Sequence, residues 1–573
     1  MCSGSIRGSR QIFTVKTVCG IEKTPFSAIF HKIAGRGVFF MANIVKECYV
    51  TMRDGVELYT VVQLPCEQGS FPVVIKRNPY LPKKMDLDAL ANEDTRGYAV
   101  VTQQCRGTAN SSGICIAYIN ERNDGLDLLD WVRKQPFYNG ELFLCGGSYC
   151  ASVHYSYLNT NPGDIKAAVL MVQDSERYNI LYRNGFFKPG LHGNWVMGMY
   201  KRNCDVKREL ADDTFRTLPL AGVTQHIFGE YVPQIEEEFL HPDPADEFWN
   251  TPAGGSDYHD VLNRCSVPVL LTTGFYDIYT GGVFDMWNSL APERRKECAL
   301  IVSPFAHAWN PPMRTEPDEL PDFENARMSQ LCPGFEYVWF DHFRLATPLE
   351  FMEKGKIKYY TLFENAWHTA EKLENAPVGM TFSLGADRTL NRESGEPGEI
   401  TYTYNPYAPA SFKGGLCNNF GGMQFQDEPN SRYDIISFVS PEFDEELICD
   451  GKIETELYCK STASDSCFYI RLSLVREGRS IGLRDDIDSL CRQENGYTPG
   501  SERKINFTFA EHSFKIQKGD RLRLDVSSSC FPHFQVHTNR IGVLALHDKA
   551  EICRNTVITG KSTIKIFVKK GDK

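Results

Sequence analysis

The sequence predicts an α/β fold followed by a separate all-β region. Short, almost continuously apolar runs alternate with helix-period stretches between residues 73 and 304. This is the pattern of parallel strands that are buried on both faces and connected by helices. From about residue 350 onward, short β-rich segments follow one another with no helical stretch between them. That second pattern is typical of a β-sandwich or jelly roll.

Two kinds of element make up the predicted α/β region. Helices are expected over Asp124–Lys134, where apolar residues recur at helical spacing, and over Phe284–Lys296, whose last turn is basic as the helix dipole favours. The strands are the apolar runs that end in Gly, Asn, Pro or a polar cluster: Val73–Ile75, Ala99–Thr102, Leu142–Cys145, Ala167–Val172, Val267–Leu271 and Ala299–Val302.

The alternation of strands and helices breaks between about residues 175 and 262. This stretch is rich in aromatic, His and Asn residues, and its predicted helices are Leu220–Val232 and Ile235–Leu240. Because it lies between two core strands, we expect it to form a cap over their carboxyl ends, where caps commonly shape a substrate pocket. The strands predicted beyond residue 350 are Gly379–Leu384, Ile453–Cys459, Cys467–Val475, Lys504–Phe509 and Arg521–Val526.

These changes of sequence pattern divide the chain into five regions. Residues 1–42 are basic, with Glu22 as the single acid before Met41, and we expect an extension outside the fold, either upstream of a natural start at Met41 or a transit peptide. The other regions are the first part of the α/β core over 43–174, the helical cap over 175–262, the second part of the core over 263–347 and the C-terminal β-sandwich or jelly roll over 348–573.

Composition excludes several classes of partner. The formal net charge of −11 argues against nucleic acid and anionic membranes, because both require a basic face. No apolar run approaches the roughly 18–20 residues that span a bilayer. The 19 cysteines are scattered without any C-x-x-C pair, which favours reduced thiols and a cytoplasmic location. The oligomeric state stays open, a homo-oligomer included.

The strongest local motif surrounds Ser148. The apolar run Leu142–Cys145 leads into Gly146-Gly147-Ser148, and a helix is predicted to follow through Tyr157. A strand, a tight turn and a helix form the context of a nucleophile elbow, which lifts the serine hydroxyl above the sheet and points the next backbone N–H at the reacting oxygen. Cys150 stands where a final Gly is expected, so the motif alone also fits an ordinary turn.

An acid and a histidine follow in the order that this kind of site requires. A serine hydroxyl needs a base to take its proton, and in this fold class the chain order is Ser, acid, His. Asp277 comes directly after the predicted strand Val267–Thr273, and His307 comes directly after Cys298–Ser303. Open α/β sheets place their sites at these carboxyl ends. The sequence therefore predicts Ser148 as nucleophile, His307 as general base and Asp277 as orienting acid.

Other candidate motifs are interpreted structurally. His154 lies on the helix behind Ser148 and is expected to be packed. The spacing of His533 and His537 could suggest a metal, but no Cys or carboxylate cluster surrounds them. Gly560-Lys561-Ser562 resembles the end of a P-loop, but Asn555 replaces the required earlier Gly. Neither a metal nor an organic cofactor is expected.

At these residues the sequence resembles the group of bacterial cocaine esterases and X-Pro dipeptidyl-peptidases, which includes α-amino-acid ester hydrolases and glutaryl acylases. The resemblance implies an α/β-hydrolase core, a helical cap and a C-terminal jelly roll. It also implies that the Tyr80 hydroxyl and the Tyr149 N–H form an oxyanion hole. Ala151 departs from the Gly that relatives usually carry. The segments that carry the resemblance are Met52–Leu58, Arg77–Tyr80, Gln104–Gly107 with Ser112-Gly113, Gly146–Tyr149, Gly274–Asp277, the segment through His307, and Leu524–Phe534.

The predicted function is hydrolysis of an ester or amide of a small molecule through an acyl-enzyme. One alternative is an X-Pro dipeptidyl-peptidase acting on short peptides, which needs acids to hold a free amino terminus. Glu236–Glu238 could serve, although a Glu run is more typical of a solvated helix face, and proline-cleaving relatives tend to carry an extra N-terminal domain that is missing here.

A third alternative is a binding protein that holds sugar or protein on its jelly roll. The cap aromatics either line an apolar acyl pocket or form the core of the cap: Tyr178, Tyr182, Phe186, Phe187 and Trp195.

Overall fold

The computed structural model describes residues 42–203, 212–307, 323–327, 331–416, 422–493 and 496–570. The expected extension over residues 1–42 lies outside the described residues except for its last position, and so does Met41. None of the helices in the described part of the chain is long and apolar enough to cross a membrane.

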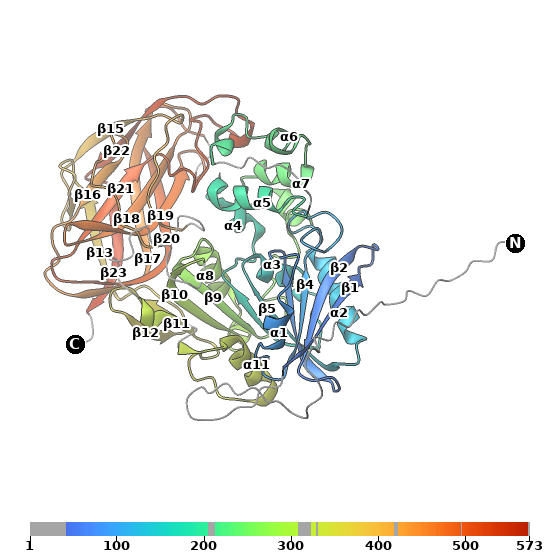
Figure 1. Cartoon of the computed structure of the whole chain (residues 1–573). Coiled ribbons are helices and arrows are strands. Elements are labelled where there is room, and N and C mark those ends of the chain that lie inside the picture. Colours follow the sequence, from blue (N-terminus) through green and yellow to red (C-terminus); the bar gives the residue numbers. More distant parts are fainter. Residues whose placement is uncertain are drawn as a thin grey trace.

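A ten-stranded sheet forms the centre of the molecule (Figure 1), and every strand predicted for the core overlaps one of its strands. The order is β1-β2-β4-β3-β5-β6-β9-β10-β11-β12. The strands from β4 to β11 in this order pair in parallel, and β1, β2 and β12 pair antiparallel at the two edges. Their bounds are β1 Ile44–Thr51, β2 Glu57–Leu64, β3 Phe71–Asn78, β4 Ala99–Gln104, β5 Tyr138–Gly147, β6 Ile165–Met171, β9 Val269–Tyr276, β10 Ala299–Ala306, β11 Ile357–Thr361 and β12 Ala366–Ala370.

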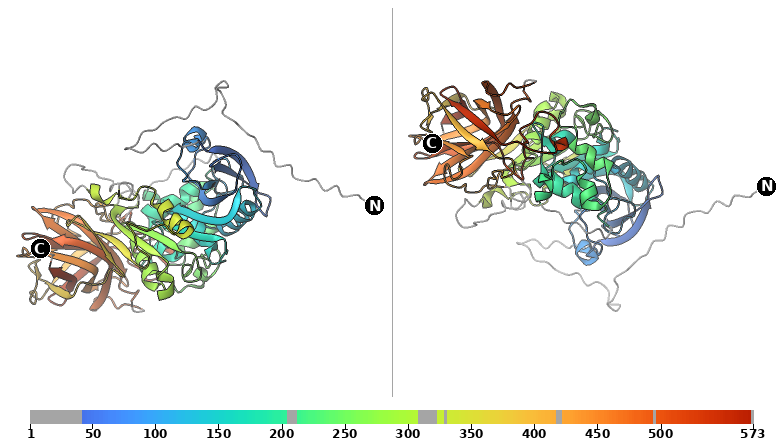
Figure 2. Two further views of the ribbon diagram at one scale, coloured as in Figure 1. Left: turned by 90° about the horizontal axis from the view of Figure 1, so that it is seen from below. Right: turned by 90° about the horizontal axis from the view of Figure 1, so that it is seen from above.

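Helices cover both faces of this sheet, because successive side chains of a strand point to opposite faces. Ile75 packs in the same apolar cluster as Leu128 of α2, whereas the neighbouring Val74 packs with Trp339 of α11. In Figure 2 the helices of the chain lie on either side of the central strands. The helix bounds are α1 Leu87–Ala91, α2 Glu121–Arg133, α3 Tyr149–Leu158, α8 Thr280–Ser289, α9 Pro292–Arg295 and α11 Phe335–Leu345.

The helix predicted over Phe284–Lys296 is wrong in its extent. Helix α8 begins at Thr280 and ends at Ser289, and the short α9 starts at Pro292, which occupies its first turn. Proline lacks an N–H and clashes with the preceding turn, so it begins a helix far more readily than it continues one.

The segment between β6 and β9 is the expected cap, but its helices are shorter than predicted. Instead of Leu220–Val232 the chain forms α6, which Gly229 ends in a left-handed conformation, and Ile235–Leu240 is replaced by α7 and one 3-10 turn. Figure 1 shows these elements beside the C-terminal β region. They are α4 Arg177–Leu181, β7 Tyr182–Arg183, β8 Phe186–Phe187, α5 Asn194–Met199, α6 Val223–Phe228, α7 Pro233–Glu236 and irregular turns at Pro189–Gly193, Asp212–Arg216, Glu237–Phe239 and Glu247–Asn250.

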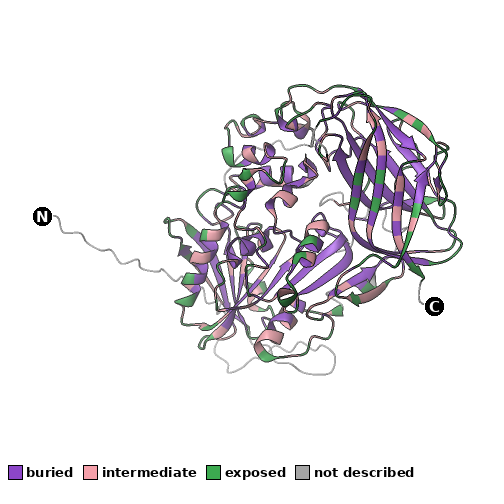
Figure 3. Cartoon of the chain, turned by 180° about the vertical axis from the view of Figure 1, so that it is seen from behind, coloured by how far each residue is buried: buried purple, intermediate pink, exposed green. Residues whose placement is uncertain are grey.

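The C-terminal region is a sandwich of antiparallel sheets, which confirms the all-β prediction. One sheet has the order β14-β13-β23-β17-β22-β15 with β20 paired to β17, and the other has the order β16-β21-β18-β19. Their inner faces are buried (Figure 3). Gly560-Lys561-Ser562 forms the turn between β22 and β23 and is no P-loop. The bounds are β13 Val378–Leu384, β14 Leu390–Asn391, β15 Gly398–Tyr404, β16 Ile436–Val439, β17 Leu447–Ser461, β18 Cys467–Arg476, β19 Arg479–Ser489, β20 Arg503–Ile516, β21 Arg521–Ser527, β22 Cys553–Thr559 and β23 Thr563–Lys570.

We predict that Trp339→Ala destabilises the protein by about 3–5 kcal/mol, because it removes a fully buried indole and leaves a cavity between α11 and the sheet. The indole N–H has no hydrogen-bond partner among the described residues. Trp339→Phe is therefore the matched control and should cost much less. Denaturant midpoints measure both, and equal shifts for the two variants would contradict packing as the cause.

Candidate active site

Ser148 occupies the sharp turn between β5 and α3. Its backbone has φ 56° and ψ −133°, a positive-φ conformation that side-chain-bearing residues rarely adopt. The Ser148 N–H donates to the carbonyl of Met171 on β6 at 2.8 Å, and the N–H of Ala151 donates to the Ser148 carbonyl at 2.7 Å. A Cβ on Gly146 would lie 2.0 Å from the Cys150 carbonyl oxygen, so only glycine fits there. The turn therefore has the geometry of a nucleophile elbow.

Asp277 and His307 reach Ser148 from the ends of β9 and β10. His307 Nε2 lies 2.7 Å from Ser148 Oγ, and His307 Nδ1 lies 3.1 Å from Asp277 Oδ1. Asp277 is fully buried and accepts a hydrogen bond from the Tyr279 N–H at 3.0 Å. The Tyr279 ring meets the His307 ring edge to face at 5.4 Å between centroids. Side chains predicted from three separate strand ends thus form one hydrogen-bonded chain.

Tyr80 and Tyr149 border the same indole ring. The Trp195 N–H donates to the Tyr80 hydroxyl at 2.9 Å, and the Trp195 ring packs on the Tyr149 ring with centroids 5.1 Å apart. Because the Tyr80 oxygen accepts from Trp195, its own proton is free to be donated to another group. Tyr80 is 40% exposed along its length, yet desolvation of its hydroxyl raises its pKa, so the phenol stays protonated at neutral pH.

The Tyr149 N–H is well placed by its position in the chain. Tyr149 is the first residue of α3, and the first N–H groups of a helix have no acceptor inside the helix. This N–H therefore lies directly beside Ser148 without an intrahelical partner. The sequence identifies Trp195 only as one of the cap aromatics, and no local pattern predicts its contact with Tyr80.

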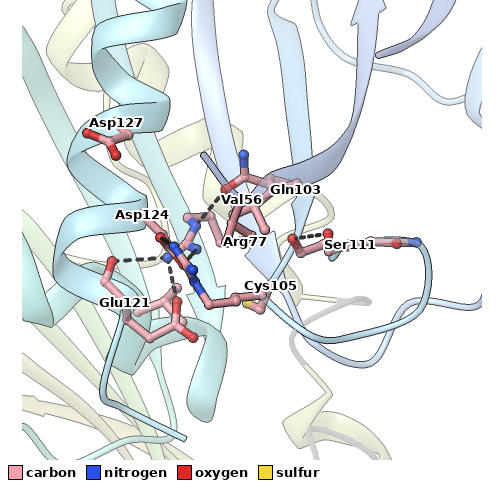
Figure 4. Close-up of polar contacts among 12 residues, drawn as sticks. Val56, Arg77, Gln103, Cys105, Ser111, Glu121, Asp124 and Asp127 are labelled. Atoms are coloured by element: carbon pink, nitrogen blue, oxygen red, sulfur yellow. Dashed lines mark hydrogen bonds and ion pairs between the residues drawn. The ribbon is translucent and has the colours of Figure 1, made fainter. Parts of the chain in front are cut away.

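A buried arginine lies between β3 and the start of α2 (Figure 4). Arg77 lies on β3, three residues before Tyr80, and its Nη1 donates to Glu121 Oε2 at 2.5 Å while its Nε donates to Gln103 Oε1 at 3.0 Å. The other Glu121 oxygen accepts from the Tyr149 hydroxyl at 2.7 Å. Arg77 is fully buried, and Figure 4 shows it between the strands and the start of α2. The network holds β3, which ends two residues before Tyr80, against the helix that begins at Tyr149.

The expectation of a solvated glutamate face in the cap is wrong for Glu236 and Glu238, whereas Glu237 between them is partly exposed. Glu236 is 1% exposed and Glu238 is 3% exposed. Glu236 accepts hydrogen bonds from the N–H groups of Gly222 and Thr224, and Glu238 pairs with Arg177 Nη2 at 2.5 Å. The cap uses these carboxylates to satisfy buried donors, because an unpaired donor in its interior would be costly.

The cap aromatics separate into two groups. Tyr182, Phe186 and Phe187 are buried, and Phe187 meets Phe239 at 4.8 Å in the interior of the cap, which supports the interpretation of a cap core. Trp195 instead faces Tyr80 and Tyr149. The cap aromatics as a group therefore do not support the prediction of an apolar or aromatic acyl pocket.

The other histidines that the sequence singles out, His154, His533 and His537, are buried. His154 is fully buried, and burial lowers its pKa to about 3. Burial likewise lowers the pKa of His533 to about 4. In the described part of the chain, no group of three or more His, Cys, Asp and Glu side chains is arranged to hold a metal ion.

Two family models match the chain one after the other. The X-Pro dipeptidyl-peptidase (S15 family) model matches residues 54–309, and the X-Pro dipeptidyl-peptidase C-terminal non-catalytic domain model matches residues 350–564. The chain belongs to the S15 family of serine hydrolases. This hydrolase is also similar to cocaine esterase from Rhodococcus sp. (strain MB1 Bresler), with 24% identity over 560 residues that cover 89% of this chain and 95% of the relative.

Solved structures share the fold of this S15-family hydrolase. An α-amino acid ester hydrolase superposes with a TM-score of 0.77 at 19% identity, covering 96% of this chain and all of that one. An aminopeptidase from a Thaumarchaeota archaeon of marine sediment superposes with a TM-score of 0.76 at 18% identity, covering 96% and 99%. These likenesses support the predicted combination of an α/β-hydrolase core with a C-terminal β domain.

We predict that Arg77→Met destabilises the hydrolase by about 3–5 kcal/mol, because it leaves the buried Glu121 carboxylate without its cation. Arg53→Met is the control, since Arg53 pairs with Asp127 at 2.8 Å at the surface, where such a pair contributes about 1 kcal/mol or less. Denaturant unfolding measures both variants. A shift for Arg77→Met no larger than that for Arg53→Met would contradict the role assigned to the network.

Proposed function

We propose that this hydrolase cleaves an ester or amide of a small molecule by two-step acyl transfer, with Ser148 as nucleophile, His307 as general base and Asp277 as orienting acid. The observation that carries the proposal is the chain of contacts from Ser148 Oγ to His307 Nε2 at 2.7 Å and from His307 Nδ1 to Asp277 at 3.1 Å. A carboxylate that accepts from Nδ1–H leaves Nε2 free to take the serine proton.

The proposed reaction proceeds in two halves. His307 Nε2 takes the proton from Ser148 Oγ as that oxygen attacks the substrate carbonyl, and the same proton then passes to the leaving alcohol or amine as the acyl-enzyme forms. In the second half His307 takes a proton from water, whose oxygen attacks the acyl carbon, and returns it to Ser148 Oγ as the acid departs. Each half restores the charge state of His307.

In each half the carbonyl oxygen becomes an oxyanion, for which we propose Tyr80 and Tyr149 as donors. The phenol of Tyr80 accepts from Trp195 and so has its proton to give, and the Tyr149 N–H is the first of α3. The Arg77–Glu121 network anchors the Tyr149 side chain and β3, from which Tyr80 follows, before substrate arrives. Preorganised donors of this kind stabilise the transition state without further rearrangement.

The second candidate function is an X-Pro dipeptidyl-peptidase, which the matched family models name. Such an enzyme must hold a free amino terminus with acceptor groups. Of the cap glutamates considered for this task, Glu236–Glu238, Glu236 and Glu238 are buried and already hydrogen-bonded to the cap itself, and the partly exposed Glu237 pairs with His241 at 3.1 Å. Ester or amide hydrolysis is therefore the better supported function, and a binding protein acting through the β-sandwich is the third candidate.

We predict that Ser148→Ala lowers turnover of an aryl acyl ester by about 10⁴-fold or more, because the attacking oxygen is lost. A Gly-Pro anilide should be hydrolysed by neither the wild type nor the variant. Chromogenic assays of both substrates measure this, with fluorophosphonate labelling of the wild type as the check that Ser148 is reactive. Anilide turnover that depends on Ser148 would favour the peptidase, and a folded protein that never labels would favour the binding protein.

We predict that Tyr80→Phe lowers kcat for the same ester by about 10²–10³-fold with little change in KM, because the lost donor acts on the transition state. Tyr433→Phe is the control, since Tyr433 is 63% exposed and far along the chain in the β region. Steady-state kinetics of the two variants decide the matter. Equal kcat values for Tyr80→Phe and the control would remove Tyr80 from the proposed oxyanion hole.

A further inference from the structure

Regular sheet pairing stops just before Asp277. Strand β9 pairs with β6 only as far as Thr272. On its other side β9 pairs regularly with β10 up to Gly274, and the register then shifts before Tyr276. A break of this kind leaves backbone groups outside the ladder of hydrogen bonds. Sheet pairing therefore brings Asp277 to the site but leaves Phe275 and Tyr276, the two residues before it, to be fixed by other contacts.

Those contacts come from β19, a strand of the β-sandwich. The Arg484 guanidinium donates to the Phe275 carbonyl, and the Tyr276 hydroxyl donates to the Gly482 carbonyl at 2.9 Å. A second nitrogen of Arg484 donates to the Glu511 carbonyl of β20 at 2.5 Å. Figure 1 shows β19 and β20 next to β9 and α8. One guanidinium thus links two strands of the sandwich to the end of β9.

Arg484 is buried but forms no ion pair in the described part of the chain. It is 2% exposed, and its hydrogen bonds go to two backbone carbonyls. Its Nε has no hydrogen-bond partner among the described residues, and the side chain borders a cavity of about 80 Å³ whose wall includes Asp174, Lys188 and Tyr279. A buried cation without a counter-ion is costly. The position of Arg484 is therefore better explained by the two carbonyls that it holds than by stability.

The residues that follow Asp277 also contact the sandwich. Helix α8 starts three residues after Asp277, and a Cβ on Gly281 in its first turn would lie 3.6 Å from the Ala510 side chain of β20. Near the other end of α8, Asn288 donates to Glu511 Oε1 at 2.9 Å. The turn that carries Asp277 is therefore held on both sides, by β19 through the end of β9 and by β20 through α8.

A small displacement of Asp277 would weaken its contact with His307. Asp277 Oδ1 lies 3.1 Å from His307 Nδ1, and a hydrogen bond weakens steeply as its angle departs from linearity. Tyr276 also pairs with Ala306, which directly precedes His307, so the same anchor acts beside both side chains. Misplacing a group of an active site by about 1 Å can cost about 10²-fold in rate.

We propose that Arg484 and Tyr276 are positioning residues for Asp277, through which the β-sandwich holds the end of β9 and keeps the carboxylate in line with His307. The inference rests on the proposed function, because it takes Asp277 as the acid that orients His307 for Ser148. It gives the β-sandwich a role in turnover that needs no contact between the sandwich and the substrate.

The first test compares Arg484→Met with Arg294→Met. Arg294 is the matched control, because its guanidinium also donates to backbone carbonyls beside β9, at 2.7 Å to Val267 and 3.0 Å to Leu262, but at the amino end of the strand. Arg484→Met should lower kcat for the aryl acyl ester by about 10²-fold with KM within about twofold of the wild type. Arg294→Met should leave both constants within about twofold.

Fluorophosphonate labelling separates a misplaced acid from a misfolded protein. Each kcat is divided by the concentration of sites that label with excess reagent, so partial folding of a variant does not count as lost activity. The rate of labelling reports how strongly His307 and Asp277 activate Ser148. In Arg484→Met this rate should fall together with kcat, whereas in Arg294→Met it should stay at the wild-type value.

The second test removes a single hydroxyl, which endangers the fold less. Tyr276→Phe should lower kcat and the labelling rate by about tenfold. Tyr404→Phe is the matched control and should change neither, since Tyr404 is a buried phenol that donates to the His537 carbonyl at 3.0 Å within the β region. Added to Asp277→Asn, Tyr276→Phe should cost less than about twofold, because the carboxylate through which it acts is already lost.

The outcomes separate this inference from the proposed function. Turnover that survives Ser148→Ala or Asp277→Asn unchanged would contradict the proposed function. If both residues are required, wild-type rates in Arg484→Met and Tyr276→Phe would overturn the positioning role. Losses equal to those of the two control variants would overturn it as well, and so would a full tenfold loss when Tyr276→Phe is added to Asp277→Asn. If the ester is not turned over, the labelling rates decide the same question.

Discussion

The buried pair between Arg77 and Glu121 is the interaction on which the candidate site depends. Removing two ions from water is costly, and a buried pair is tolerated only when its remaining hydrogen-bonding groups are satisfied. Here Gln103 accepts from the guanidinium and the Tyr149 hydroxyl donates to the second carboxylate oxygen, while Arg77 Nη2 has Asp124 at 3.8 Å as an ion-pair partner without a hydrogen bond. The same bonds fix the strand that leads to Tyr80 and the helix that starts beside Ser148. The proposed oxyanion donors are thereby positioned by the interior of the core and not by a surface loop.

A second constraint is the backbone of Ser148 itself. Its positive φ is unfavourable for a residue with a side chain, and such conformations persist only where the surrounding structure holds them. The Met171 carbonyl on β6 accepts the Ser148 N–H, and Gly146 lets α3 approach the strand closely. Because β6 also leads to Asp174, the strand that holds the serine turn in place also carries one wall of the cavity.

The sequence predicts the sheet and its site-bearing strand ends well, because apolar runs and the polar residues after them are local patterns. Ser148, Asp277 and His307 were found in this way, and their catalytic roles stay predictions. The contact of Trp195 with Tyr80 could not be found in this way, because its two partners are distant in sequence. Tyr80 was identified through the family resemblance, and the buried state of the cap glutamates depends on partners distant in sequence.

The difference between residues that the sequence predicts and residues that it does not has a physical cause, which also bears on substrate specificity. The proposed reaction groups follow strand ends, where parallel pairing determines their positions, whereas the cavity wall combines residues of the core with residues of the cap and the β-sandwich. Arg183 lies in the cap, five residues before Lys188, and pairs with Asp486 of β19 at 2.7 Å. The β-sandwich therefore helps to determine where Lys188 lies. A change in either region can therefore alter the lining of the cavity while the distances between Ser148, His307 and Asp277 stay the same. Esterases and peptidases can on this basis share one core and differ in the residues that line its cavity.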